Sequence, residues 1–475
     1  MTMEDSLRLA FSVQGWGSCL RCNGFRFGSC AAETLMPSYI SEVRMEKVVT
    51  INDVFRTSRG LPKNYVTRKS VDEKFINALS LDSHIVVHGS SKQGKTSLRK
   101  WNLQDDDFIV LTCSNNWKLE ELHISILKEA GYLVSVSESK THKGTSKISV
   151  GFDIPFLAGP KANCDVSKEK ARQVNKKNLE LDPSDVNDII RALHEINFTK
   201  FIVIEDFHYL PESTQIDFSV ALKAFHESSD ICFIIVGVWL EVDRLTVHNG
   251  DLTGRVISIN ADLWSGDDFD TLFFNSESLL NISFSDNFKE DVKQNSNGSI
   301  FLVQQLCLLA CEGQGISQTQ SETVVVGEHF KVAESIKDIL GSHNARYYKF
   351  LTEFSAGFDQ TELELYKWIL YAIIETELTH LEKGLTVAAT RRCIARKHPK
   401  SSAVTQRKLT QFLRRAVDLQ LRHSIKPIVI EYDANTMRIK IVDRSFLLWR
   451  EYQDKEELYD YADLTDDLHS PLVEL

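Results

Sequence analysis

The sequence predicts an α/β fold: a parallel sheet with helices on both faces, followed by a helical region. Three observations lead to this prediction. Short apolar runs alternate with stretches of helical spacing, as they do when each buried strand returns through a helix. A glycine-rich loop follows the first run, and an acidic pair ends the third. The runs are 84–88, 107–113, 201–204, 231–236 and 256–259.

The glycine-rich loop reads Gly89-Ser90-Ser91-Lys92-Gln93-Gly94-Lys95-Thr96, which fits the P-loop pattern G-x-x-x-x-G-K-[ST]. Ser97 then opens a predicted helix. A strand, a glycine loop and a helix in this order let backbone N–H groups and the helix N-terminus hold phosphate groups. We therefore expect Gly89 to Ser97 to bind a nucleoside triphosphate, with Lys95 at the β- and γ-phosphates and Thr96 on Mg²⁺.

The third apolar run ends in Glu205-Asp206. A phosphate loop needs an acidic partner at the end of a neighbouring strand, because one carboxylate orients the metal and another activates the attacking water. By position, Glu205 is the expected metal-side acid and Asp206 the expected base. The alternative is that two surface acids simply end a strand.

The composition of this chain of 475 residues limits its partners and its cellular environment. Its formal net charge is -11, which does not favour nucleic acid as a partner of the whole chain. No apolar run approaches the roughly 20 residues of a membrane span. The nine cysteines are scattered, as expected of a protein in a reducing cytoplasm.

Five regions are expected from the changes in composition. Residues 1–44 have no clear periodicity and are expected to form a poorly ordered extension. The helical spacing after the last strand predicts a small lid, and the later helices followed by a hairpin suggest a winged helix. The further regions are a core at 45–260 with a basic insertion at 135–182, a helical lid and linker at 261–325, a winged-helix domain at 326–455, and a frayed acidic tail at 456–475.

Basic residues concentrate between 391 and 426, where eleven Lys and Arg accompany one acid, Asp418. Such clustering in an acidic chain suggests contacts with nucleic-acid phosphates. The alternatives are a solvated face, a docking face for an acidic subunit, or a surface on which the acidic tail folds back. The candidate contacts on the last helix before the hairpin and on the hairpin itself are Arg407, Lys408, Arg414, Arg415, Arg438 and Lys440.

The phosphate loop, the acid-ended strand, the lid and the winged helix together resemble the AAA+/STAND group of P-loop ATPases over about residues 45–450. Within that group, the chain is most similar to origin-recognition-type initiators and to archaeal and defence-associated STAND ATPases. The resemblance implies ATP and Mg²⁺ as cofactors, and DNA, further copies of the chain or an effector protein as partners. It also implies that Tyr65, Val66 and Arg68 pack on the adenine, and that Arg255 senses the γ-phosphate or acts on a neighbouring subunit.

Two departures from the group's pattern affect the expected activity. The acids occur in the order Glu205-Asp206, where the group usually has Asp first. The fourth strand ends in Val236-Gly237-Val238-Trp239, where the group has a polar sensor. We therefore expect a slow Mg²⁺-dependent ATPase that works as a nucleotide-controlled switch. The alternative is a non-hydrolysing winged-helix DNA-binding or scaffold protein that holds its nucleotide as a structural ligand.

Overall fold

The structure is a computed structural model that describes residues 48–55, 60–140, 146–152, 177–239, 244–359 and 361–469, so the expected extension at 1–44 lies outside it. At its centre is a five-stranded parallel sheet in the order β2-β6-β7-β1-β8. All five predicted strands are present, and the predicted fold class is confirmed. They are β1 (His84–His88), β2 (Phe108–Thr112), β6 (Phe201–Glu205), β7 (Phe233–Val236) and β8 (Val256–Asn260).

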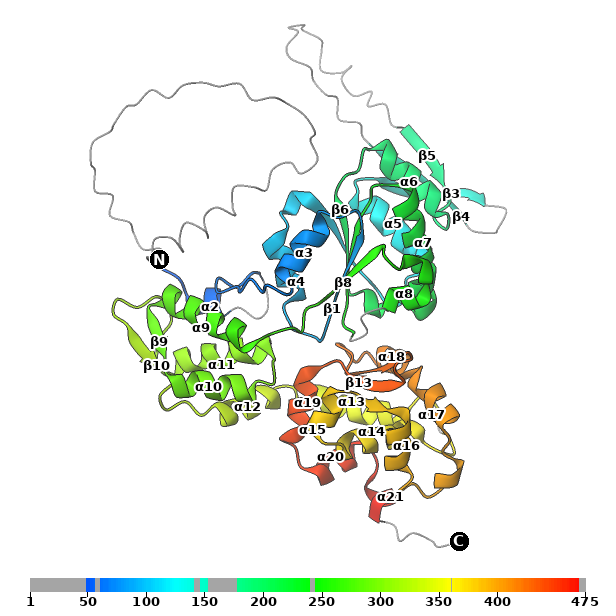
Figure 1. The fold of residues 1–475 in the computed structure, drawn as a ribbon. Coiled ribbons are helices and arrows are strands. Elements are labelled where there is room, and N and C mark those ends of the chain that lie inside the picture. Colours follow the sequence, from blue (N-terminus) through cyan, green and yellow to red (C-terminus); the bar gives the residue numbers. More distant parts are fainter. Residues whose placement is uncertain are drawn as a thin grey trace, which may run out of the picture. The chain divides into compact units, whose positions relative to one another are not determined.

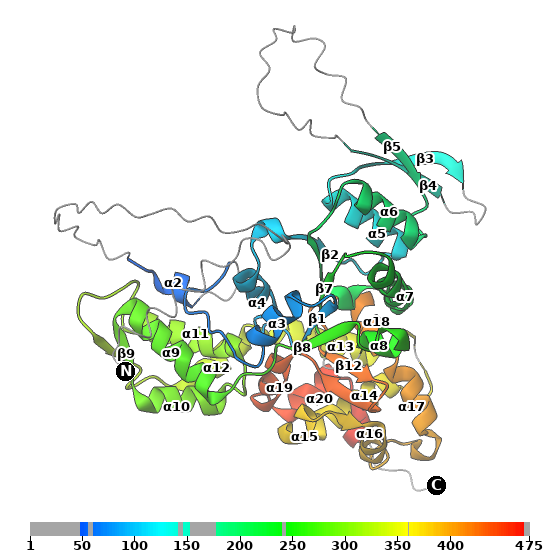
Figure 2. The same cartoon turned by 45° about the horizontal axis from the view of Figure 1, so that its top comes forward.

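Helices cover both faces of this sheet (Figures 1 and 2). Successive side chains of a strand point to opposite faces, so Ile85 and Val87 of β1 join one buried cluster and Val86 joins the other. The first face is covered by α3 (Asp72–Leu79) and α4 (Lys95–Asn102). The second is covered by α5 (Leu119–Glu129), α6 (Val186–Glu195) and α7 (Glu212–Ser228), with α8 (Arg244–His248) beside α7.

The basic insertion after α5 forms a three-stranded antiparallel sheet in the order β3-β4-β5. Its strands are β3 (Leu133–Lys140), β4 (Ser146–Phe152) and β5 (Lys177–Leu181). Residues 141–145 and 153–176 of this insertion lie outside the described residues.

The lid follows β8 as α9 (Gly266–Leu280), α10 (Asp286–Asn295) and α11 (Ile300–Gly313). A short parallel pair, β9 (Ile282–Phe284) and β10 (Val324–Val326), closes it. The helix α2 (Ile51–Val54) packs on α9 and α11, and the backbone N–H of Ile51 donates to the carbonyl of Ser317. The first described residues therefore belong to the lid rather than to the sheet.

The C-terminal region is helical and contains a three-stranded antiparallel sheet in the order β11-β13-β12. Its buried apolar side chains form one cluster with those of the lid. The predicted hairpin is present as β12 and β13, and β11 is an additional strand. The elements are α12 (Val332–Gly341), α13 (Asn344–Ala356), α14 (Leu365–Glu375), α15 (Leu378–Glu382), β11 (Leu385–Thr386), α16 (Val387–Ile394), α17 (Gln406–Leu413), α18 (Ala416–Arg422), β12 (Ile430–Asp433), β13 (Arg438–Ile441) and α19 (Arg444–Glu451).

The acidic tail is ordered as far as residue 469, so the prediction of a frayed tail is wrong for this part. It forms α20 (Lys455–Tyr461) and α21 (Thr465–His469), and Leu458 and Leu464 are fully buried. The ammonium group of Lys367, on α14, is paired with Asp463 at 3.2 Å and with Asp467 at 2.6 Å. These acids balance a buried lysine, which explains why the segment folds back. None of the helices in the described ranges has the length and apolarity needed to cross a bilayer.

The segment after β7, at Gly237 and Trp239, is tightly packed. Trp239 is fully buried, and a Cβ added at Gly237 would lie 1.6 Å from its ring. Gly237→Ala is therefore expected to destabilise the protein by about 3 kcal/mol, the upper range for overpacking. Urea unfolding measures the effect. Gly250→Ala, where a Cβ would meet nothing within 4 Å, is the control, and equal losses in both variants would contradict the prediction.

Candidate functional site

The glycine-rich loop leaves β1 and enters α4 through three positive φ angles: 137° at Gly89, 61° at Lys92 and 84° at Gly94. Glycine adopts such angles at little cost, and Gly94 is the N-cap of α4. The first intrahelical bond runs from the N–H of Leu98 to the carbonyl of Gly94. The N–H groups of the first turn therefore have no partner within the helix, which makes this end of α4 suited to an anion.

Two contacts hold the start of the loop. Asp262 accepts hydrogen bonds from the N–H and the hydroxyl of Ser90, each at 2.7 Å. The N–H of Gly89 donates to the carbonyl of Trp239 at 3.0 Å. A Cβ at Gly89 would lie 2.7 Å from Asp262 Oδ1, so this close approach requires glycine. Sequence reasoning missed Asp262, although its place just beyond the carboxyl end of β8 was the available signal.

Lys95 lies back along the loop. Its Nζ donates to the carbonyls of Gly89 at 3.0 Å and Ser90 at 2.5 Å. Burial lowers its pKa from the ordinary 10.5 to about 8, and the negative charges of Asp262, Glu205 and Asp206 oppose this shift. The predicted acids thus lie within electrostatic range of the predicted lysine.

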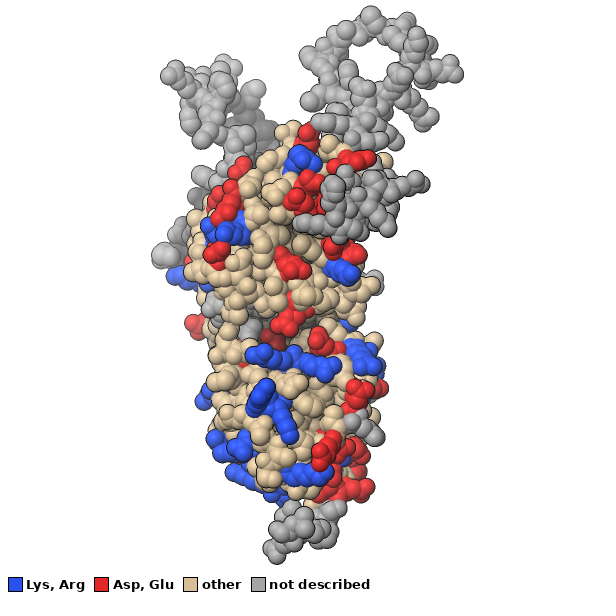
Figure 3. Space-filling model, turned by 90° about the vertical axis from the view of Figure 1, so that its right-hand side faces the viewer, with Lys and Arg blue, Asp and Glu red and all other residues tan. Residues whose placement is uncertain are grey.

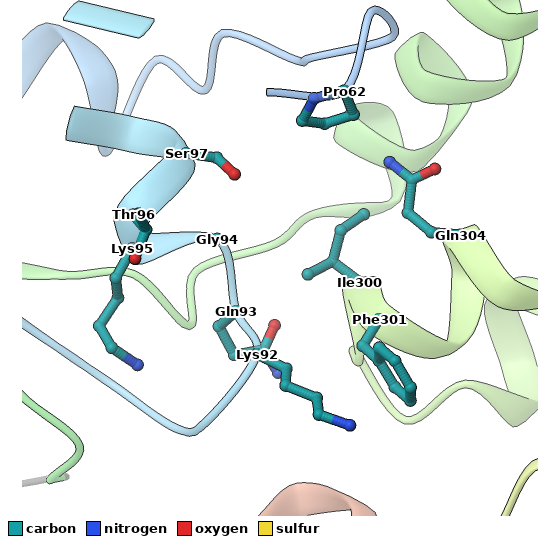
Figure 4. A pocket seen from close by; sticks show the side chains of 10 residues that line it. All are labelled: Pro62, Lys92, Gln93, Gly94, Lys95, Thr96, Ser97, Ile300, Phe301 and Gln304. Atoms are coloured by element: carbon teal, nitrogen blue, oxygen red, sulfur yellow. The ribbon is translucent and has the colours of Figure 1, made fainter. Parts of the chain in front are cut away.

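A pocket of about 220 Å³ lies between the loop and the lid helix α11 (Figure 4). The ammonium of Lys92 lies 3.8 Å from the centre of the Phe301 ring on α11. Gln304, also on α11, exchanges hydrogen bonds with Asn64, which fixes this wall. The pocket is lined by Pro62, Lys92, Gln93, Gly94, Lys95, Thr96, Ser97, Ile300, Phe301 and Gln304.

The residues that line this pocket do not include Tyr65, Val66 or Arg68, and their expected contact with adenine stays a prediction. Tyr65 donates to Asp72 at 2.6 Å, and Val66 is buried in the lid cluster. Arg68 is fully buried, and its guanidinium donates to the carbonyl of Ala261 at 2.7 Å. These side chains fasten the segment before α3 to the core, and Pro62 takes the place beside the pocket.

The two acids stand at the carboxyl end of β6. Glu205 Oε1 accepts a hydrogen bond from Arg99 Nε at 3.2 Å. Burial raises the pKa of Glu205, and Arg99 opposes that shift. Burial also raises the pKa of Asp206, and Lys95, followed by Lys426, opposes it. Asp206 has a φ of 58°, a strained angle for a residue other than glycine and one often found at functional sites.

The structure does not support the expectation that Arg255 senses the γ-phosphate bound by its own chain. It precedes β8, and its backbone carbonyl accepts from the N–H of His84 at the start of β1. The loop begins at the other end of β1, five residues further on, or about 16 Å away at 3.3 Å per residue. The guanidinium of Arg255 instead binds Glu227 at 2.7 Å.

The site fits a nucleotide with Mg²⁺ in two respects. The side chain of Gln93 is 1% exposed, lines the pocket, and has no hydrogen-bond partner for its amide in the described part of the chain. Leaving such a group unpaired is costly, and a polar ligand would satisfy it. Thr96 offers a hydroxyl at the pocket, and the preceding residue, Lys95, is in electrostatic range of two carboxylates. Mg²⁺ takes few protein ligands together with phosphate oxygens and water.

The basic residues divide into two groups. Arg407, Lys408 and Arg414, on and just after α17, are exposed. The hairpin residues are engaged internally: Arg438 donates to the carbonyl of Gly384, and Lys440 pairs with Asp433 at 2.6 Å. Arg415 is exposed, with its guanidinium 4.0 Å from the Phe358 ring centre. Figure 3 shows Lys and Arg side chains spread over the C-terminal part of the face it presents.

No protein-family model matches the sequence, and neither does any protein of curated function. Among solved structures, a Walker-type ATPase of Pyrococcus abyssi is similar over 84% of this chain and 99% of its own, at 14% identity and a TM-score of 0.50. Cdc6p of Pyrobaculum aerophilum matches 89% of this chain and 100% of its own, at 14% identity and a TM-score of 0.35. Orc1 of Aeropyrum pernix, solved in complex with DNA, matches 88% and 99%, at 9% identity and a TM-score of 0.42. The likeness to the Pyrococcus abyssi protein confirms the expected α/β fold.

The lowered pKa of the partly buried Lys95 predicts a pH dependence of stability. The unfolded amine keeps its ordinary pKa of 10.5, so between pH 8 and 10.5 the unfolded chain binds more protons and stability rises with pH. Lys95→Met removes this effect. The variant is expected to be more stable than the wild type near pH 7, by at most about 3.5 kcal/mol at 1.4 kcal/mol per pKa unit, with a difference that closes toward pH 10.5.

Urea unfolding at several pH values between about 7 and 10 measures this difference. Lys100→Met, on the exposed side of the same helix, is the control and is expected to keep the pH dependence of the wild type. A difference between Lys95→Met and the wild type that does not change with pH would contradict the assignment.

Proposed function

We propose that the protein is a Mg²⁺-dependent ATPase of AAA+/STAND type that acts as a nucleotide-controlled switch. One observation carries the proposal. The loop Gly89–Thr96 is held in left-handed turns at the N-terminus of α4, with Lys95 in electrostatic range of Glu205 and Asp206. Anion-binding backbone, a buried cation and two carboxylates are the groups that phosphoryl transfer to water requires. The fold shared with a Walker-type ATPase supports ATP as the nucleotide.

Each group has a role in this proposal. The N–H groups of the first turn of α4 and the Lys95 ammonium balance the charge that spreads over the phosphates. Thr96 and Glu205 hold Mg²⁺, which when bound neutralises phosphate charge. Asp206 orients the attacking water and takes up its proton. Pro62, Ile300 and Gln304 enclose the base, with two apolar contacts and one amide.

We propose slow turnover. The strand β7 ends in Val236-Gly237-Val238-Trp239, which supplies no polar side chain beside the acids. The acids stand in the order Glu205-Asp206, which puts the longer carboxylate on the metal side. The same observations favour the second candidate, a protein that holds ATP without hydrolysing it. The five cysteines in the described residues form no disulfide with one another, consistent with a cytoplasmic location.

We further propose that the exposed basic residues around α17 bind nucleic acid. The order of helices and strands from α14 to β13, with a three-stranded antiparallel sheet, supports a winged helix. Exposed cations grouped on one helix are suited to phosphate contacts. The internal contacts of Arg438 and Lys440 favour the helix over the hairpin as the binding element.

A phosphate-release assay tests the enzymatic proposal. Wild type is expected to release phosphate from ATP slowly with Mg²⁺. Lys95→Ala is expected to lose ATP binding, because the phosphates lose their principal cation. Asp206→Asn is expected to keep ATP binding and to lose about 10²–10⁴-fold in rate, the usual contribution of a general base. Arg255→Ala, at the opposite strand end, is the control. Binding without any turnover in the wild type would favour the second candidate.

Binding of a short DNA duplex at several salt concentrations tests the basic surface. The double reversal Arg407→Glu with Arg414→Glu is expected to weaken binding and to flatten the dependence of log K on log salt by about one unit per lost phosphate contact. Lys337→Glu reverses an exposed lysine on α12 and is the matched control. Equal losses in the two variants, or no binding by the wild type at low salt, would contradict the proposal.

A further inference from the structure

Arg99 forms an ion pair with Glu205 but has no role in the function proposed above. The Nε of Arg99 lies 3.2 Å from Oε1 of Glu205. Both side chains are largely removed from water, with 9% of Arg99 and 16% of Glu205 exposed. A buried pair of this kind gains little net stability, because the cost of desolvation offsets the attraction between the charges. A role in folding alone therefore explains the pair poorly.

The position of Arg99 suggests another role. It stands four residues after Lys95 on α4, so the two side chains lie on the same face of the helix. Glu205 ends β6, two strands away from β1, which carries the loop. The pair thus ties the helix that presents Lys95 and Thr96 to the strand that presents Glu205.

The hydrogen bond between Arg99 and Glu205 engages one of the two carboxylate oxygens. It uses Oε1 of Glu205, and Arg99 donates through Nε rather than through a two-pronged contact. The guanidinium rests against the ring of Phe108 on β2, with its central carbon 4.7 Å from the ring centre. Packing on Phe108 holds the Arg99 guanidinium in place. The guanidinium in turn orients the Glu205 carboxylate through Oε1, and Oε2 is left to another partner.

We propose that Arg99 is a positioning residue for Glu205: it holds the carboxylate by Oε1 so that Oε2 serves the Mg²⁺ that accompanies the nucleotide. This inference rests on the proposed function. Residues that orient a metal ligand through a hydrogen bond typically change metal affinity 10- to 100-fold when they are replaced. Arg99 is therefore expected to affect the Mg²⁺-dependent part of nucleotide binding and not the remainder.

Binding of a fluorescent ATP analogue, with Mg²⁺ and with EDTA, measures the two parts separately. In the wild type, Mg²⁺ is expected to increase the affinity. Arg99→Gln is expected to keep the affinity measured in EDTA and to lose about 10- to 100-fold of the gain from Mg²⁺. Arg99→Lys is expected to restore part of that gain. In a Glu205→Gln background, Arg99→Gln is expected to have no further effect, because its target is already removed.

Thermal unfolding of every variant accompanies the titrations, and Arg191→Gln, at an exposed pair with Asp188 on α6, is the matched control. Two results for Arg99→Gln would overturn the inference and leave the proposed function intact: an equal loss of affinity for the analogue in EDTA and with Mg²⁺, or the full gain in affinity from Mg²⁺. A wild type that binds the analogue with no gain from Mg²⁺ would overturn the proposed function itself. If Arg99→Gln does not fold, Arg99→Lys replaces it, and a full gain from Mg²⁺ in that variant overturns the inference.

Discussion

The site depends on the carboxylate of Asp262 and its two hydrogen bonds to Ser90. A loop built to expose its N–H groups to an anion cannot satisfy them with its own carbonyls. Asp262 satisfies the first of these groups and leaves the later ones, at the start of α4, available. This arrangement sets a negative charge beside a site for phosphates. Lys95, and Arg444 at 3.8 Å from Asp262, balance that charge.

The same carboxylate links three parts of the protein. Arg444 begins α19, and it also donates to the carbonyl of Asn297, just before the lid helix α11. The N–H of Ser91 donates to the carbonyl of Val442 at 3.3 Å, so a loop group that could face phosphate is engaged by the C-terminal region. Hydrogen bonds weaken steeply within about 1 Å of stretching. A small displacement of the loop would therefore alter its contacts with both the lid and the C-terminal region.

The parts of the site that the sequence predicted are local in the chain. The apolar run, the glycine loop and the helix start are adjacent, and Glu205-Asp206 directly follows its strand, so short-range patterns identify them. Asp262 and Arg99 act through contacts that only the folded sheet creates. The place of Asp262 after a strand marks it as a candidate but does not show which group it binds. Arg255 lies at the sheet edge opposite the loop, because the carboxyl ends of parallel strands meet at one edge and Arg255 precedes its strand. A role of Arg255 at the site of a neighbouring subunit stays a prediction. Tyr65 and Arg68 do not line the pocket, because Asp72 and the carbonyl of Ala261 bind their polar groups elsewhere.

Tertiary contacts decide which charged side chains of the protein are available to a partner. With a net charge of -11, an acidic tail that covered the basic surface around α17 was a reasonable alternative. In the folded chain, Asp463 and Asp467 are paired with Lys367, Asp454 caps α20, and Glu457 accepts from Tyr348. These acids are committed to holding the end of the chain on the helical region. The cations around α17 are thus left to solvent or to a partner, and the acidity of the chain as a whole does not argue against a polyanion there.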